Sequence, residues 1–236
     1  MNKLLIVIGV IILISILVLG WLGFVPGLST LLGADRPRDL GVKYTQADLQ
    51  SLYAKSGVTR TVIPPGQTVK QSMTFTGSHA VKTSFTQEEL SARLDADTWK
   101  YQIAKNPQIK INNDGTVEIS GRLVTANVDK VAEYYNLDPS HREELAKALS
   151  AVKTNPSFYV KARPSVVNNQ VSLVIEQSQI GRLPVPGGLA EKYDVAQIAE
   201  QMLRQVNGLF VNSASFADGK MSFDGSLPDV LGREEQ

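Results

Sequence analysis

Cysteine is absent from this chain of 236 residues, and charge is absent from a long stretch near its start. Without cysteine there is no disulfide framework and no thiolate ligand for a structural zinc site. The chain carries 24 basic and 23 acidic side chains, and Lys3 is the only charged residue before Asp35. The remainder is therefore electrically balanced, without a long basic run. We expect no nucleic-acid partner, because nothing would attract a polyanion.

Signatures of catalysis are also scarce. The two histidines, His79 and His141, stand apart, and the chain contains no HExxH, GxSxG, GxGxxG or phosphate-loop motif. Asp95 and Asp97 form a candidate acid–base pair, but a helix end is an ordinary place for solvated acids. Residues 112–115 resemble part of a calcium loop, yet lack its spaced acids and closing glutamate. We expect a non-enzymatic protein without metal or cofactor.

A long uncharged apolar run is the strongest feature that is present. It extends from Leu4 to Phe24, which is about the 20 residues that a helix needs to cross a bilayer. Trp21 and Phe24 lie where aromatic side chains favour the headgroup layer, and Pro26 can end the helix. The sequence predicts a single membrane-spanning helix over residues 4–24.

A cleaved signal peptide is the alternative. The apolar run exceeds the usual length of about 7–15 residues, and Leu32-Gly33-Ala34 places a leucine where a cleavage site needs a small residue. We therefore predict an uncleaved signal-anchor. Lys3 adjoins one end of the run closely, whereas Arg36 and the basic residues after it lie farther from the other end. This favours a cytoplasmic N-terminus, with the bulk of the chain extracytoplasmic.

Four segments are expected along the chain: an anchor (1–24), a stalk (25–44), a folded domain (45–231) and a polar tail (232–236). In the domain, helices alternate with strands of period two. Helices are predicted near 45–57 and 86–94, and at Val128–Tyr135, Asp138–Val152 and Val195–Asn207. Strands are predicted at Gln71–Phe75, Ala80–Phe85, Gln108–Asn112, Thr116–Val124, Phe158–Ala162, Ser165–Val167, Val171–Ile180, Leu209–Phe216 and Lys220–Phe223. This pattern predicts an α+β fold with an antiparallel sheet and helices packed on one face.

The loop Gly181–Leu189 and the helix after it are the candidate ligand-binding region. Prolines stiffen the loop, and an aliphatic stripe runs along the helix. One interpretation is an apolar groove in which Arg182 is the polar residue that contacts the ligand. The simpler interpretation is that these residues pack in the core. The candidate ligand-binding residues are Arg182, Leu183, Val185, Ile198, Met202, Leu203 and Val206.

Several short motifs together resemble a known family. They are Phe85-Thr86-x-x-Glu89-Leu90, the Ile109–Ile119 hairpin with Asp114-Gly115, Gly181-x-Leu183-Pro184-Val185-Pro186, and the Asp218-Gly219 hairpin. Over residues 84–227 the chain is similar to small single-pass bacterial envelope proteins whose outer domain resembles tubular lipid-binding domains. That resemblance implies a long curved sheet that wraps a helix and leaves an apolar channel. The helices predicted between residues 127 and 152 depart from the pattern.

Two functions from different classes remain open at this point. The first is a membrane-anchored envelope protein whose apolar groove binds lipid or another hydrophobic ligand. The second is a non-catalytic interaction or scaffold domain, with a fully packed core, for another envelope protein. An open pocket lined by aliphatic side chains would favour the first, and a flat apolar patch the second.

Overall fold

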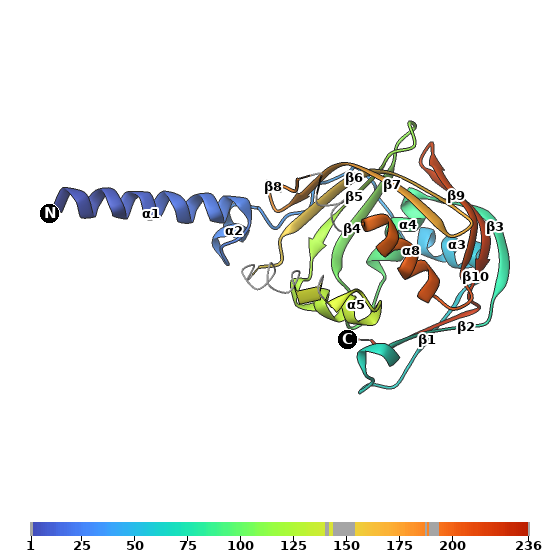
Figure 1. Cartoon of the computed structure of the whole chain (residues 1–236). Coiled ribbons are helices and arrows are strands. Elements are labelled where there is room, and N and C mark those ends of the chain that lie inside the picture. The colour runs from blue at the N-terminus through green and yellow to red at the C-terminus, as the bar shows by residue number, and fades with distance from the viewer. Residues whose placement is uncertain (1, 140–141, 144–153, 187, 189–193, 236) are drawn as a thin grey trace.

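The computed structural model describes residues 2–139, 142–143, 154–186, 188 and 194–235, and only the backbone of residues 2–9. The first helix, α1 (Asn2–Leu22), projects away from the body of the protein, as Figure 1 shows. A short helix, α2 (Leu28–Leu31), follows it. Among the residues whose side chains are described, no helix is both long and apolar enough to span a membrane.

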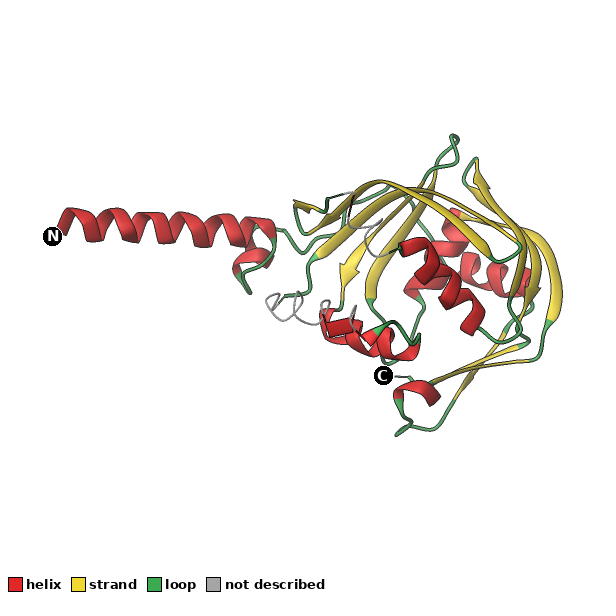
Figure 2. Cartoon of the chain, in the orientation of Figure 1, coloured by secondary structure: helices red, strands yellow, loops and turns green. Residues whose placement is uncertain are grey.

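Eight strands form one curled antiparallel sheet, a half-barrel in which the order is β3-β10-β9-β6-β5-β4 and β7 lies between β6 and β8. Helices α3, α4 and α8 lie on its concave side, as Figure 2 shows. The predicted α+β class, with helices on one face of an antiparallel sheet, is therefore confirmed. The strands are β3 (His79–Thr86), β4 (Ala104–Ile111), β5 (Val117–Leu123), β6 (Ser157–Val167), β7 (Gln170–Ile180), β8 (Leu183–Pro184), β9 (Phe210–Ala217) and β10 (Lys220–Leu227).

The three long hairpins of this sheet follow from their turn residues. β4 and β5 join through residues 112–116, as predicted. β6 and β7 join at Asn168-Asn169, with φ of 51° and 60°, and β9 and β10 join at Asp218-Gly219, with φ of 49° and 74°. Two successive positive φ values give the tight turn that matches the twist of paired strands. Asparagine, aspartate and glycine tolerate that conformation best.

Pro164 lies within β6, a position that a sheet tolerates only where no strand needs its missing N–H. β5 pairs with β6 as far as Ala162, and β9 pairs with it from Val166 onward. On the side of β6 opposite β7, Pro164 therefore falls between two neighbouring strands. That edge of β6 is thus shared by β5 before Pro164 and β9 after it.

A second sheet differs from the sequence prediction. It contains β1 (Thr59–Val62), β11 (Val230–Arg233) and β2 (Met73–Thr76), and β1 runs parallel to β11. Residues 232–236 were expected to form a polar tail, but β11 extends through Arg233, which is 1% exposed. The pairing partners lie far apart in the chain, so local periodicity carried no sign of them.

The helices of the body are α3 (Gln46–Ser56), α4 (Gln87–Asp95), α5 (Val128–Tyr134) and α8 (Val195–Gln205), with 3₁₀ turns η1 (Val69–Gln71) and η2 (Thr125–Asn127). α3 ends at Gly57, whose φ of 67° makes the left-handed cap that was predicted. α4 begins with the predicted capping box between Thr86 and Glu89. The helix predicted at Asp138–Val152 lies largely outside the described residues.

The main core lies between α3 and the strands β3, β9 and β10. Its buried members are Leu52, Val81, Phe85, Val211, Ala214 and Phe223. A separate aromatic cluster of Val69, Trp99 and Tyr134 joins η1 to α5. The Trp99 indole N–H donates to the Ser72 hydroxyl at 3.0 Å, so the buried indole nitrogen has a hydrogen-bond partner.

α4 packs against β4 and completes the hydrogen bonds of that edge strand. The Ser91 hydroxyl accepts from the N–H of Ile109 at 2.8 Å, and the side-chain oxygen Oε1 of Gln87 accepts from the N–H of Ile111 at 3.0 Å. An unpaired buried N–H costs free energy, and an open strand edge invites association with other chains. α4 thus connects β3, which precedes it, to the opposite end of the half-barrel.

We predict that Ser91→Ala lowers the free energy of unfolding by about 1–3 kcal/mol, because the N–H of Ile109 loses its acceptor inside the protein. Ser91 is fully buried, so water cannot replace the hydroxyl. Urea unfolding of the full chain in neutral detergent measures the change. Ser215→Ala, an exposed position on β9, is the matched control and should stay within about 0.5 kcal/mol. Equal effects of the two changes would contradict this account of the β4 edge.

Candidate functional site

An apolar cavity of about 220 Å³ lies beside the main core. Its wall comes from α3, α4, β2, β3, β10, β11 and the segment after α8. Most of the side chains are aliphatic or aromatic, including Leu52, Phe75, Leu90, Val206, Met221 and Leu231. The Tyr53 ring also lines it, but its hydroxyl accepts a hydrogen bond from Arg60 at 2.9 Å. The space therefore suits hydrocarbon rather than a polar ligand.

In the described part of the chain, Arg93 is the one charged residue that lines the apolar cavity. It is half-buried, and among the described residues nothing forms an ion pair or hydrogen bond with its guanidinium. Arg93 lies three positions after Leu90 on α4, and residues at that spacing share a helix face. A buried or half-buried cation normally has a partner. The cavity thus combines an apolar interior with one positive charge that no described residue pairs with.

A cluster of positive charge adjoins this cavity. Arg233 has an almost completely buried side chain and forms an ion pair with Asp97. Burial, followed by the nearby charge of Arg93 and then of Arg60, lowers the pKa of Arg233 to about 10. Arg233 remains protonated at neutral pH, and the guanidinium groups of Arg93 and Arg60 are near enough to act on it. Three guanidinium groups thus gather beside the apolar cavity.

Asp97 was one of the two carboxylates that the sequence offered for acid–base chemistry. In the structure it binds Arg233 and accepts from the backbone N–H of Trp99 at 3.0 Å. Its partners are thus those of a structural ion pair, and no shared site with Asp95 is formed among the described residues.

His79 connects two segments near the apolar cavity. Its Nδ1 lies 2.7 Å from the carboxylate of Asp229, and its Nε2 lies 2.8 Å from the carbonyl oxygen of Ser56. Both partners are acceptors, so both ring nitrogens can donate only when the imidazole is protonated. The Ser56 carbonyl, followed by the Asp229 carboxylate, raises the pKa of His79. Ser56 lines the cavity at the end of α3, so this contact holds one side of it.

A second, polar cavity of about 240 Å³ contains the candidate residue Arg182. Arg36 and Arg38 line it as well, with Tyr159 and Gln179 of β6 and β7. Arg182 therefore lies in a polar cavity, whereas the sequence suggested it as the handle of an apolar groove. Leu183 is 45% exposed in β8, and Val185 donates its N–H to the carbonyl oxygen of Ser178 at 2.9 Å.

The four candidate residues on or after α8 are half-buried but do not share one cavity. Val206 lines the apolar cavity, whereas Ile198 lines another, beside residues 136–139. Met202 and Leu203 line neither of these cavities nor the polar one. The residues that sequence reasoning missed come mainly from α3, α4 and β10. The spacing of Leu90 and Arg93 was the one available signal.

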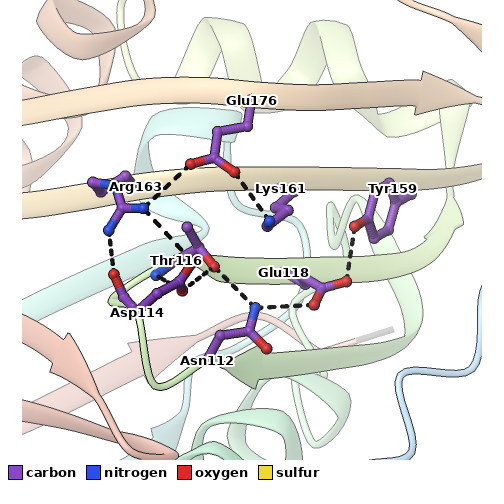
Figure 3. Close-up of polar contacts among 8 residues, drawn as sticks. All are labelled: Asn112, Asp114, Thr116, Glu118, Tyr159, Lys161, Arg163 and Glu176. Atoms are coloured by element: carbon purple, nitrogen blue, oxygen red, sulfur yellow. Dashed lines mark hydrogen bonds and ion pairs between the residues drawn. The ribbon is translucent and has the colours of Figure 1, made fainter.

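The turn that resembled a calcium loop is explained by its own contacts. The Asp114 carboxylate accepts from the N–H of Thr116 at 3.0 Å and from its hydroxyl at 2.7 Å. Figure 3 shows that Arg163, Lys161 and Glu176 continue a polar network across β6 and β7. In the described part of the chain, no group of histidine, aspartate and glutamate side chains is arranged to hold a metal ion.

We compared the chain with known protein families, curated proteins and solved structures. No family model, curated protein or solved structure matches this chain.

We predict that the folded chain is more stable below about pH 6.5 than above pH 8, because the raised pKa of His79 favours protonation in the folded state. This stabilisation is complete below the ordinary histidine pKa and disappears as pH rises through the raised value. Melting temperatures of wild type and His79→Gln between pH 5.5 and 8.5 measure the effect. The difference between the two should shrink with rising pH.

His141→Gln is the control for the loss of a histidine, since the described partners of His79 are Asp229 and Ser56. It should retain the wild-type pH profile. A difference between wild type and His79→Gln that stays constant over this range would mean that His79 does not stabilise the fold through its charge.

Proposed function

We propose that this protein is a single-pass, membrane-anchored extracytoplasmic protein whose apolar cavity binds the hydrocarbon chain of a lipid or a similar hydrophobic ligand. The observation that supports this most is the cavity of about 220 Å³ with its aliphatic and aromatic wall. A dry apolar cavity of about 150 Å³ already suffices for a molecule such as benzene. The larger space here accommodates a short alkyl chain, or part of a longer one.

The chemistry of the wall favours an amphiphile with a negative head. Arg93 supplies an unneutralised guanidinium at the cavity, and Arg60 and Arg233 add positive charge nearby. A carboxylate or phosphate beside Arg93 would form a charge-assisted hydrogen bond in a partly desolvated place. The alkyl part would then remove the apolar wall from water, at about 25 cal/mol for each Å² buried.

Membrane anchoring rests on the sequence of α1 and its surroundings. Residues 4–24 are uncharged and apolar, and α1 extends away from the body rather than packing into it. Ile11, Leu13 and Leu17, among the side chains described on α1, are each more than two-fifths exposed. Such a row of exposed aliphatic side chains is costly in water and favourable in a bilayer.

We predict that Val206→Trp abolishes the uptake of a fluorescent fatty acid by the full chain, because the indole fills the apolar cavity. Val195→Trp is the matched control. Val195 is also a half-buried valine, at the other end of α8, and it lines none of the three cavities. It should leave uptake unchanged. Native mass spectrometry of the purified wild type should also detect a co-purifying lipid.

Failure of the wild type to take up any hydrophobic probe would remove this function. Substitution of Leu90 or Val206 by Ala would then be expected to behave as an ordinary core truncation, at about 2–5 kcal/mol for leucine. That pair of results would support the alternative, a packed interaction domain for another envelope protein.

We predict that the native protein resists extraction by alkaline carbonate and keeps its N-terminal segment, because residues 4–24 are long enough to cross the bilayer. Intact mass of the extracted protein checks the second point. External protease should digest the body in intact cells whose cell wall is permeable. A mature N-terminus near Asp35, or full protection while a control surface protein is digested, would contradict the anchor or its orientation.

A further inference from the structure

The polar cavity lies where α1 and α2 meet the body of the protein. Gly33, Ala34 and Arg36 contribute to its wall from the segment after α2, and Gly181 and Arg182 contribute from the turn between β7 and β8. Figure 1 shows this turn beside the end of α1. The cavity therefore adjoins the point at which the proposed membrane helix ends.

Arg182 is fixed in this cavity by contacts that leave its charge intact. Its guanidinium donates to the carbonyl oxygens of Trp21 at 3.2 Å and Leu32 at 2.9 Å. It also lies 5.0 Å from the centre of the Trp21 ring. Two neutral acceptors and an aromatic face position the cation without a carboxylate.

Arg38 is positioned in a similar way, by residues of β6 and β7. Its guanidinium carbon lies 3.6 Å from the centre of the Tyr159 ring, and one nitrogen donates to the side-chain oxygen of Gln179 at 3.1 Å. Both partners are neutral. Stacking fixes the plane of the guanidinium and directs its remaining N–H groups sideways.

Arg36 is the third cation, and its guanidinium has no hydrogen-bond or ion-pair partner among the described residues. It stands two positions before Arg38, and both side chains line the polar cavity. The neighbouring acid, Asp35, is engaged elsewhere: it accepts from Thr30 at 3.0 Å and lies 3.8 Å from Arg122. Among the residues that the structure describes, no carboxylate lines the cavity.

This absence of a counter-charge contrasts with the other cations of the body. Many of them pair with acids, as in Lys55–Glu89, Lys82–Asp224, Lys100–Glu234, Lys161–Glu176, Arg204–Glu200 and Arg233–Asp97. Three arginines around one cavity repel one another unless an anion joins them. Guanidinium groups bind phosphate oxygens in a bidentate manner, and net charge selects an anionic ligand.

We propose that the polar cavity binds the phosphate of an anionic phospholipid from the membrane that holds α1, with Arg36, Arg38 and Arg182 as donors. The proposal relies on the membrane anchoring proposed above but not on the apolar cavity. Trp21 lies at the end of α1 and stacks on Arg182, so the headgroup layer and the cavity coincide. Binding there would fix the orientation of the body relative to the bilayer.

The test uses the full chain with Val206→Trp, purified in neutral detergent, so that lipid uptake by the apolar cavity is closed. Native mass spectrometry follows the titration with dioleoylphosphatidylglycerol and, separately, dioleoylphosphatidylcholine, which have the same acyl chains. We expect the anionic lipid to bind about tenfold more tightly. Arg36→Gln should remove most of that preference, because it deletes a charge-assisted contact and breaks no hydrogen bond or ion pair among the described residues.

Two matched variants complete the test. Lys43→Gln removes one exposed positive charge from the same segment but does not line the cavity, and it should keep the preference. Arg36→Lys keeps the charge but not the planar fork and should retain part of it. Equal binding of the two lipids, or equal losses in Arg36→Gln and Lys43→Gln, would overturn the proposal. Displacement of the anionic lipid by inorganic phosphate at a similar concentration would overturn the lipid as the ligand.

Discussion

Two side chains of α4 satisfy the backbone of β4, and the shape of the body depends on that contact. A curled sheet that does not close into a barrel leaves open strand edges, and β3 and β4 are the edge strands at the two ends of its main strand order. Because α4 directly follows β3 and hydrogen-bonds β4 through Gln87 and Ser91, it spans the opening between them. Glu89 of the same helix binds Lys55 of α3 at 2.7 Å, which fixes the second helix inside the curve.

The apolar cavity is a consequence of this arrangement. Helices α3 and α4 and the segment after α8 supply part of its wall, and β2 and β11 of the small sheet supply another part. The wall therefore comes from many segments, and the sequence of no single one of them is apolar enough to predict a binding site. The same geometry brings Arg93 of α4 toward Arg233 of β11, so the cavity acquires a positive charge.

The apolar and the polar cavity differ in the number of arginines that line them and in what surrounds those arginines. In the apolar cavity, the half-buried Arg93 lies beside a wall of aliphatic and aromatic side chains, which suits a ligand with a long apolar part. In the other, Arg38 and Arg182 are positioned by aromatic rings and neutral oxygens, which suits a compact anion. A protein with an apolar helix at its start and both kinds of site would contact lipid in two chemically distinct ways.

The sequence alone determined the local structure. The positive-φ turn residues at Asn168-Asn169 and Asp218-Gly219, the capping box at Thr86 and the glycine cap at Gly57 each act within a few residues, so their elements were predictable. The α+β class followed from the alternation of those elements. The parallel pairing of β1 with β11 joins segments about 170 residues apart, and no local pattern encodes such a contact.

Tertiary structure decided where the candidate residues lie. The amphipathic stripe of α8 predicted a single apolar wall, yet Val206 and Ile198 line different cavities, because a helix within a curved sheet faces several surfaces along its length. Arg182 was singled out as the polar partner of an apolar groove. Its position beside Arg36 and Arg38 depends on how the β7–β8 turn meets the segment after α2. Composition fixes which charges exist, but only the fold decides which of them share a cavity.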